Sequence, residues 1–142
     1  MIFTALSDEP LELQAIVARV STPESGGVVV FEGRTRSPSD GRDVVRLVYE
    51  AFEERAEKQL ETFAIEIAAR DGVHGVAAVH RTGVVGVGEP SVVVVVAAEH
   101  RGEAFAGARD LIDRIKSEAA MWKKEVFADG EAWSSGERSG PA

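Results

Sequence analysis

The sequence predicts an α+β fold, in which helices pack on a mostly antiparallel sheet. Short β-rich runs follow one another between residues 76 and 98, with only Gly- and Pro-containing turns between them. Two longer segments, 53–70 and 103–119, instead repeat apolar residues at helical spacing and place charged residues on the other face. A chain of 142 residues suits one domain with its own core. We therefore expect a single domain over residues 1–133 and a flexible tail over 134–142, where Ser, Gly and Pro are frequent.

The individual elements follow from local composition. Pro10, shortly after a Ser and an Asp, is typical of a helix start, and residues 35–42 hold the turn-forming residues of a loop. Val92 to Val96 has no polar alternation, so we expect both faces of that strand to be covered. We expect strands over 2–6, 27–31, 44–52, 76–81, 84–87 and 92–98, and helices over about 8–20, 53–70 and 103–119. The last helix should turn its apolar side to the core, namely Phe105, Ala108, Ile112 and Ile115.

Composition excludes several classes of function. Lys plus Arg is 16 and Asp plus Glu is 24, which gives a net charge of −8. Such an acidic chain is poorly suited to a nucleic-acid backbone or an anionic membrane, and its longest apolar run is far shorter than the roughly 20 residues of a membrane span. There is no Cys, which excludes disulfides and thiolate chemistry, and the three His lack metal-binding spacing. We expect a cytoplasmic protein without a metal or cofactor.

Basic residues are grouped in a way that predicts an anion site. Arg34 and Arg36 follow one strand, His100 and Arg101 follow another, and Lys116, Lys123 and Lys124 lie at or just after the end of the last helix. If the strand ends lie together, these cations converge, and the guanidinium fork of Arg suits phosphate. The alternative is that they are solvated ends paired with nearby carboxylates. The glycines between Gly83 and Gly88 have no helix after them and predict a hairpin turn, not a phosphate loop.

Lys116 and Lys123 are seven residues apart, so they would share a helix face if the helix continued that far. Two ammonium groups close together lower one another's pKa, and a neutral Lys is a usable nucleophile or general base. The alternative is a pair of ordinary surface lysines, which the helix macrodipole favours at a C-terminus.

Six segments, taken in order, resemble one family. They are Phe31-Glu-Gly-Arg-Thr-Arg36, Leu47-Val-Tyr-Glu50, His80-Arg-Thr-Gly83, His100-Arg-Gly-Glu-Ala-Phe105, Asp113-Arg-Ile-Lys116 and Trp122-Lys-Lys-Glu125. Together they are similar to the large, catalytic subunit of molybdopterin synthase. The resemblance runs from about residue 2 to Trp133, and the order of the motifs makes the combination specific.

The resemblance implies an α/β hammerhead fold with a small β subdomain, and a homodimer that binds two copies of a small ubiquitin-like sulfur carrier. That carrier ends in a Gly-Gly thiocarboxylate. The implied substrate is cyclic pyranopterin monophosphate, which receives two sulfurs in turn to give the dithiolene of molybdopterin while its cyclic phosphate opens. A sulfurtransferase without Cys must take its sulfur from another molecule, so the composition is consistent with this activity.

By the same resemblance, Lys116 and Lys123 match catalytic residues, and the substrate-binding positions are Arg36, His100, Arg101 and Phe31. The chain departs from the family at Ala120, where Pro is usual; Pro would end the helix, whereas Ala lets it continue. We expect exposed apolar residues between Trp122 and Trp133 to surround the mouth of the channel for the carrier tail.

Two other classes of function stay open from the residues. One is a non-catalytic module that binds a phosphorylated metabolite or a nucleotide. The other is a structural partner subunit whose groove holds a peptide tail and which has no need of Lys116. Turnover with a thiocarboxylated carrier separates the enzyme from both.

Overall fold

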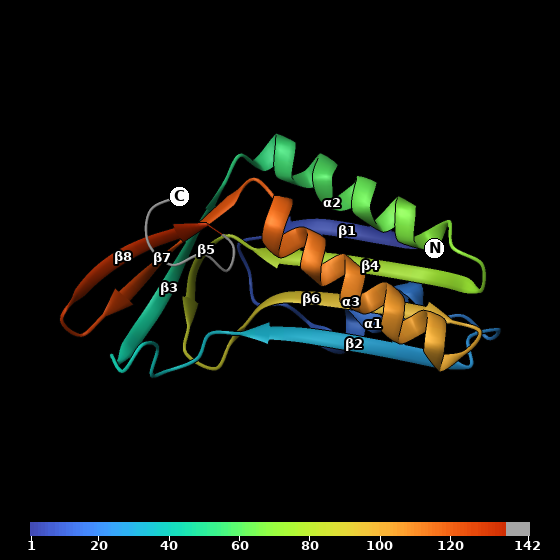
Figure 1. Cartoon of the computed structure of the whole chain (residues 1–142), viewed down its shortest axis with the longest axis horizontal. Coiled ribbons are helices and arrows are strands. Elements are labelled where there is room, and N and C mark those ends of the chain that lie inside the picture. Colours follow the sequence, from blue (N-terminus) through green and yellow to red (C-terminus); the bar gives the residue numbers. More distant parts are fainter. Residues whose placement is uncertain (136–142) are drawn as a thin grey trace.

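The computed structural model describes residues 1–135, which form two four-stranded sheets and three helices (Figure 1). The predicted α+β class and the order of elements up to the last helix are confirmed. No helix among the described residues is long and apolar enough to cross a membrane. The elements are β1 (Ile2–Ser7), α1 (Leu13–Val20), β2 (Gly27–Arg34), β3 (Val44–Ala51), α2 (Glu53–Ala68), β4 (Val73–Arg81), β5 (Gly83–Gly86), β6 (Pro90–Ala98), α3 (Arg101–Glu118), β7 (Met121–Phe127) and β8 (Gly130–Ser135).

The first sheet has the strand order β1-β4-β6-β2 and holds most of the core. β1 pairs with β4 in parallel, and the other pairs are antiparallel. Every side chain of β6 from Ser91 to Ala98 is buried, as the unbroken apolar run predicts. Val92, Val94 and Val96 pack toward α2 and α3, while Val93 and Val95 face α1 on the opposite side (Figure 1).

Helices α2 and α3 lie side by side on one face of this sheet because each carries an apolar stripe. In α2 the buried stripe is Ala56, Leu60, Phe63, Ala64 and Ile67. In α3 the expected inward residues Ala108, Ile112 and Ile115 are buried. Phe105 was expected among them but is 62% exposed, because its face of α3 points past the edge of the sheet formed by β2.

The second sheet has the order β5-β3-β7-β8, and all its neighbouring strands are antiparallel. It lies at one end of the first sheet, around a smaller core of Val44, Leu47 and Phe127 (Figure 1). The sequence did not predict β7 and β8. They occupy the segment between Trp122 and Trp133, and Trp133 is partly exposed. The predicted tail begins inside β8, at residues 134 and 135, and residues 136–142 lie outside the described residues.

The last helix ends within one residue of its predicted end, although Ala120 would permit it to continue. α3 ends at Glu118, and Ala119 already has extended backbone angles of φ −66° and ψ 141°. Two contacts hold the turn open: the backbone N–H of Ala120 donates to the Gln59 side chain at 2.7 Å, and its carbonyl accepts from the N–H of Phe52 at 3.1 Å. An Ala permits a helix but does not enforce one, so these tertiary contacts decide the geometry.

A tight backbone contact between α1 and β4 generates a stability prediction. A Cβ at Gly75 would lie 1.9 Å from the carbonyl oxygen of Val20, so Gly75→Ala forces the C-terminus of α1 away from the sheet. We expect a loss of about 1–3 kcal/mol in the free energy of unfolding. The control Gly102→Ala meets no atom within 4 Å in the first turn of α3 and should not destabilise. Equal denaturant midpoints for the two variants would contradict this packing.

Candidate functional site

The candidate site lies where the two sheets meet, and it consists of two adjoining cavities. The inner chamber has a volume of about 40 Å³ and the outer chamber about 400 Å³. Four residues line both cavities and so mark their junction: Tyr49, Ser91, Lys116 and Lys123. The inner chamber is closed mainly by apolar residues of β6, α3 and β7, whereas most residues around the outer chamber are polar.

The two candidate catalytic lysines reach this junction from different elements, a helix and a strand. Lys116 is in the last turn of α3, which packs on the first sheet. Lys123 is on β7 of the second sheet, directly opposite Tyr49 of β3. The condition for a shared helix face is not met, because the helix ends at Glu118 and the chain turns at residues 119 and 120, but the structure brings both lysines to the same pair of cavities.

Strand alternation separates Lys123 from its neighbour Lys124. The Lys124 ammonium lies 3.7 Å from the Glu131 carboxylate and 5.4 Å from the centre of the Trp133 ring, and the residue lines neither chamber. The predicted cluster of three lysines therefore divides into two that face the cavities and one that stabilises the β7–β8 hairpin.

The predicted arginines lie at the rim of the outer chamber. Arg34 ends β2 and forms an ion pair with Glu32 at 3.0 Å, and Arg36 follows in the next loop. Phe31 lines neither chamber. It is partly exposed on β2 and lines a neighbouring groove that also reaches Lys116.

His100 and Arg101 do not join this cluster within one chain. They stand at the N-terminus of α3, where the backbone N–H of His100 donates to Glu103 at 3.1 Å. Fifteen residues of helix separate Arg101 from Lys116, which is about 22 Å at 1.5 Å per residue. Part of the predicted convergence of cations is thus found in the single chain, and these two residues lie at the far end.

His80 lies in the candidate site but was not among the predicted site residues: it falls in a family motif, yet the three histidines lack metal-binding spacing and no other sequence feature assigned His80 a role. Its ring is buried in the inner chamber, its Nδ1–H donates to the Arg81 carbonyl at 2.7 Å, and it contacts the Tyr49 ring edge-to-face at 4.9 Å. The pKa of His80 is lowered to about 4, mainly by burial; the Arg81 hydrogen bond opposes this shift, and the charge of Lys116 adds to it. Burial also raises the pKa of Tyr49. Both rings are therefore neutral at pH 7.

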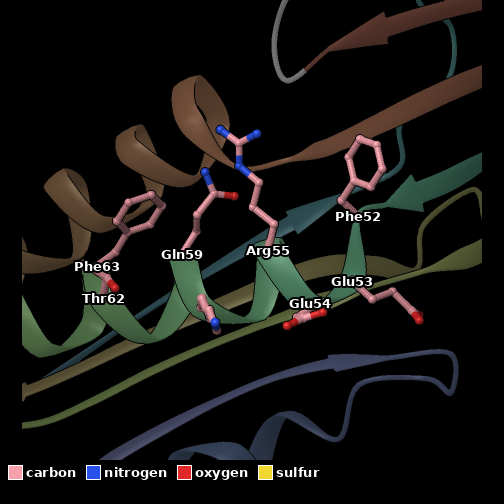
Figure 2. Close-up of a pocket in the computed structure, with 8 residues that line it drawn as sticks. Phe52, Glu53, Glu54, Arg55, Gln59, Thr62 and Phe63 are labelled. Carbon is pink, nitrogen blue, oxygen red and sulfur yellow. The ribbon is translucent and has the colours of Figure 1, made fainter.

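A wider cavity elsewhere lacks this convergence of cations. It has a volume of about 740 Å³ and runs along the first turns of α2, where Arg55 lies among Glu53 and Glu54 (Figure 2). Lys58 also lines it. Within residues 1–135, no group of three or more His, Asp or Glu side chains could hold a metal ion. The two chambers remain the place where cations from several elements meet.

Residues 6–118 match the family model of the MoaE protein. The chain belongs to this family. It is 38% identical over 133 residues to the molybdopterin synthase catalytic subunit of Pyrococcus abyssi, with 94% of this chain and 90% of the relative covered. It is 40% identical over 133 residues to molybdopterin synthase catalytic subunit 1 of Mycobacterium tuberculosis, with 92% and 89% covered.

Solved structures of MoaE relatives have the same fold. The crystal structure of molybdopterin synthase from Staphylococcus aureus aligns with a TM-score of 0.86 at 32% identity, covering 91% of this chain and 94% of that one. The MoaE protein from Burkholderia ambifaria aligns with a TM-score of 0.81 at 33% identity, covering 97% and 92%. The family resemblance seen in the sequence motifs is confirmed.

Acid should destabilise the protein through His80. Its folded pKa of about 4 lies below the ordinary value of 6.5, so as the pH falls the unfolded chain takes up the proton first. The stability that the neutral ring provides is complete above about pH 6.5 and is lost toward pH 4, a change of about 2–3 kcal/mol. Urea unfolding at about pH 7 and 4.5 measures it. His80→Gln should lose less stability over this interval than the wild type, and an equal loss would contradict the assignment.

Proposed function

We propose that this chain is the catalytic subunit of a molybdopterin synthase. It transfers sulfur from the thiocarboxylate of a small carrier subunit to cyclic pyranopterin monophosphate. One observation carries the proposal: Lys116 of α3 and Lys123 of β7 line both a small inner chamber and the outer cavity that adjoins it, which Arg34 and Arg36 also line. The curated relatives named above support it, because they are molybdopterin synthase catalytic subunits over nearly their full length. The cytoplasmic location stays a prediction from the sequence.

Each part of the site has a role in this reaction. The outer chamber, with Arg36 at its rim, takes the anionic end of the substrate, since guanidinium groups bind phosphate through paired hydrogen bonds. The carrier's Gly-Gly tail is thin enough to bring its terminal carbonyl beside Lys116. There the sulfur forms its bond to the substrate and the carrier's C–S bond breaks as water attacks the carbonyl carbon, directly or after transient capture by a lysine amine, so that the carrier leaves as a carboxylate. The lysines move the protons in these steps. Because the His80 ring is neutral, the positive charge in the inner chamber comes from the ammonium groups of Lys116 and Lys123.

Lysine substitutions test the proposed catalysis. Lys116→Ala and Lys123→Ala should fold normally, because neither side chain belongs to the core, and should lose nearly all turnover. Lys124→Ala is the matched control: it is adjacent on β7 but lines neither chamber, so it should keep most of the wild-type rate. Product is measured by mass spectrometry after incubation with thiocarboxylated carrier and cyclic pyranopterin monophosphate. Wild-type turnover by Lys116→Ala would exclude its catalytic role.

We also propose that the chain acts as a homodimer in which β2 pairs with β2 of a second copy. β2 is an edge strand of the first sheet, and an apolar groove beside it includes Val30, Phe31 and the exposed Phe105. An unpaired strand edge next to apolar side chains favours pairing with another chain. A two-fold pairing would cover these residues on both copies at once.

Such a dimer would complete the site. One end of β2 lies against the start of α3, since a Cβ on Gly27 would be 3.3 Å from the Cα of Arg101. The other end, at Gly33 and Arg34, borders the outer chamber. Antiparallel pairing of two β2 strands places the first end of one copy beside the second end of the other. The partner's His100 and Arg101 would then approach the outer chamber, which accounts for all the predicted substrate-binding cations.

Charge on the β2 edge should break the dimer. Val30→Asp puts a carboxylate into the proposed interface and should give a folded monomer with little turnover. Val45→Asp is the control, because Val45 is similarly exposed but lies on β3 of the second sheet. Sedimentation velocity at micromolar concentration should show dimers for the wild type and for Val45→Asp. A wild-type monomer, or an intact Val30→Asp dimer, would contradict this interface.

A further inference from the structure

The relative position of the two lysines depends on a very short connection. α3 ends at Glu118 and β7 begins at Met121, so only Ala119 and Ala120 join them. The helix belongs to the first sheet's packing and the strand to the second sheet. A small rotation of this two-residue turn would therefore swing Lys123 relative to Lys116. Something must fix the turn if the two ammonium groups are to act on the same bound molecule.

Gln59 of α2 contacts both sides of that turn. Its side-chain N–H donates to the Glu118 carbonyl at 2.8 Å, and its side-chain oxygen accepts from the Ala120 backbone N–H at 2.7 Å. Figure 2 shows the Gln59 carboxamide extending from α2 toward the end of α3. The last carbonyls of a helix and the first N–H after it have no partner within the helix, so one carboxamide satisfies a group on each side.

One backbone contact also reaches the turn, because the N–H of Phe52, just before α2, donates to the Ala120 carbonyl at 3.1 Å. The side-chain links between α2 and α3 lie away from the turn. Arg114 of α3 contacts Glu66 of α2, and Arg70, just after α2, pairs with Asp110 of α3 at 2.7 Å. Neither ion pair reaches residue 119 or residue 120. Of the side-chain hydrogen bonds defined within residues 1–135, only those of Gln59 reach both sides of the turn.

We propose that Gln59 is a positioning residue for sulfur transfer: its carboxamide fixes the α3–β7 turn and thereby the geometry of Lys116 relative to Lys123. This role rests on the proposed function. It assigns no contact with substrate to Gln59, which does not line either chamber. The same contact explains why Ala is tolerated at position 120: unlike Pro, Ala has a backbone N–H, and this N–H donates to the Gln59 side chain.

Truncation of the side chain tests the role against a matched control. In the reconstituted complex with thiocarboxylated carrier and cyclic substrate, Gln59→Ala should lower kcat by about tenfold or more with little change in KM, since small misplacements of reacting groups are costly. Glu66→Ala removes a link between the same two helices and should keep a kcat close to that of the wild type. Wild-type kcat in Gln59→Ala, or an equal loss in Glu66→Ala, would overturn the proposal.

A second substitution provides the rescue. Ala120→Pro removes the N–H that Gln59 binds and fixes the backbone in its place, and Ala119 already has the extended angles that a residue before Pro adopts. Gln59→Ala combined with Ala120→Pro should therefore recover most of the lost kcat. A folded double variant as slow as Gln59→Ala would count against a positioning role, and thermal unfolding establishes that it is folded.

Amide hydrogen exchange separates this inference from the proposed function, because it needs no turnover. The Ala120 N–H should exchange slowly in the wild type and in Glu66→Ala, and much faster in Gln59→Ala. Fast exchange in the wild type would refute the contact itself. If the wild type makes no product although the Ala120 N–H is protected, the proposed function fails, whereas the contact between Gln59 and the turn is supported. If the wild type is active and Gln59→Ala is equally active, the inference alone fails.

Discussion

The burial of β6 on both faces is the constraint on which the rest of the structure depends. A strand of consecutive valines needs an apolar layer on each side, and the chain supplies α2 and α3 on one face and α1 on the other. This packing leaves α3 little freedom to slide. The last turn of α3 consequently lies beside Ser91 and Val92 at the start of β6, so the packing of the core places Lys116 at the site.

The second sheet contributes residues that surround Lys116 on the other side of the site. It brings Tyr49 and Lys123 across from β3 and β7, and it closes a chamber that neither sheet forms alone. The two sheets have separate cores, and the turn at residues 119 and 120 connects α3 on the first sheet to β7 of the second. The geometry of the candidate site therefore depends on how the two sheets contact each other.

Much of the fold could be predicted from the sequence, because helices α2 and α3 and strand β6 are specified by local apolar patterns. The hairpin of β7 and β8 could not, since β7 is stabilised by pairing with β3, at least 70 residues earlier in the chain, and, among the described strands, β8 pairs only with β7. The end of α3 was predicted correctly to within one residue, but the contacts of Gln59 with the turn after it could not be predicted, because Gln59 is about 60 residues earlier in the chain. The site lysines were predicted by motif, whereas His80 was missed because burial beside Lys116, not spacing, gives it a place there.

A mixed dimer tests most directly whether each site is shared between two chains. One protomer carries Lys116→Ala and its partner carries Arg101→Ala, with different affinity tags so that the mixed species can be isolated. If Arg101 serves the chamber of the other copy, one chamber carries both defects and the other is intact, so turnover should recover to about half that of the wild-type dimer. Both parent homodimers should be inactive. A mixed dimer as inactive as its parents would contradict the shared site and confine each active site to a single chain.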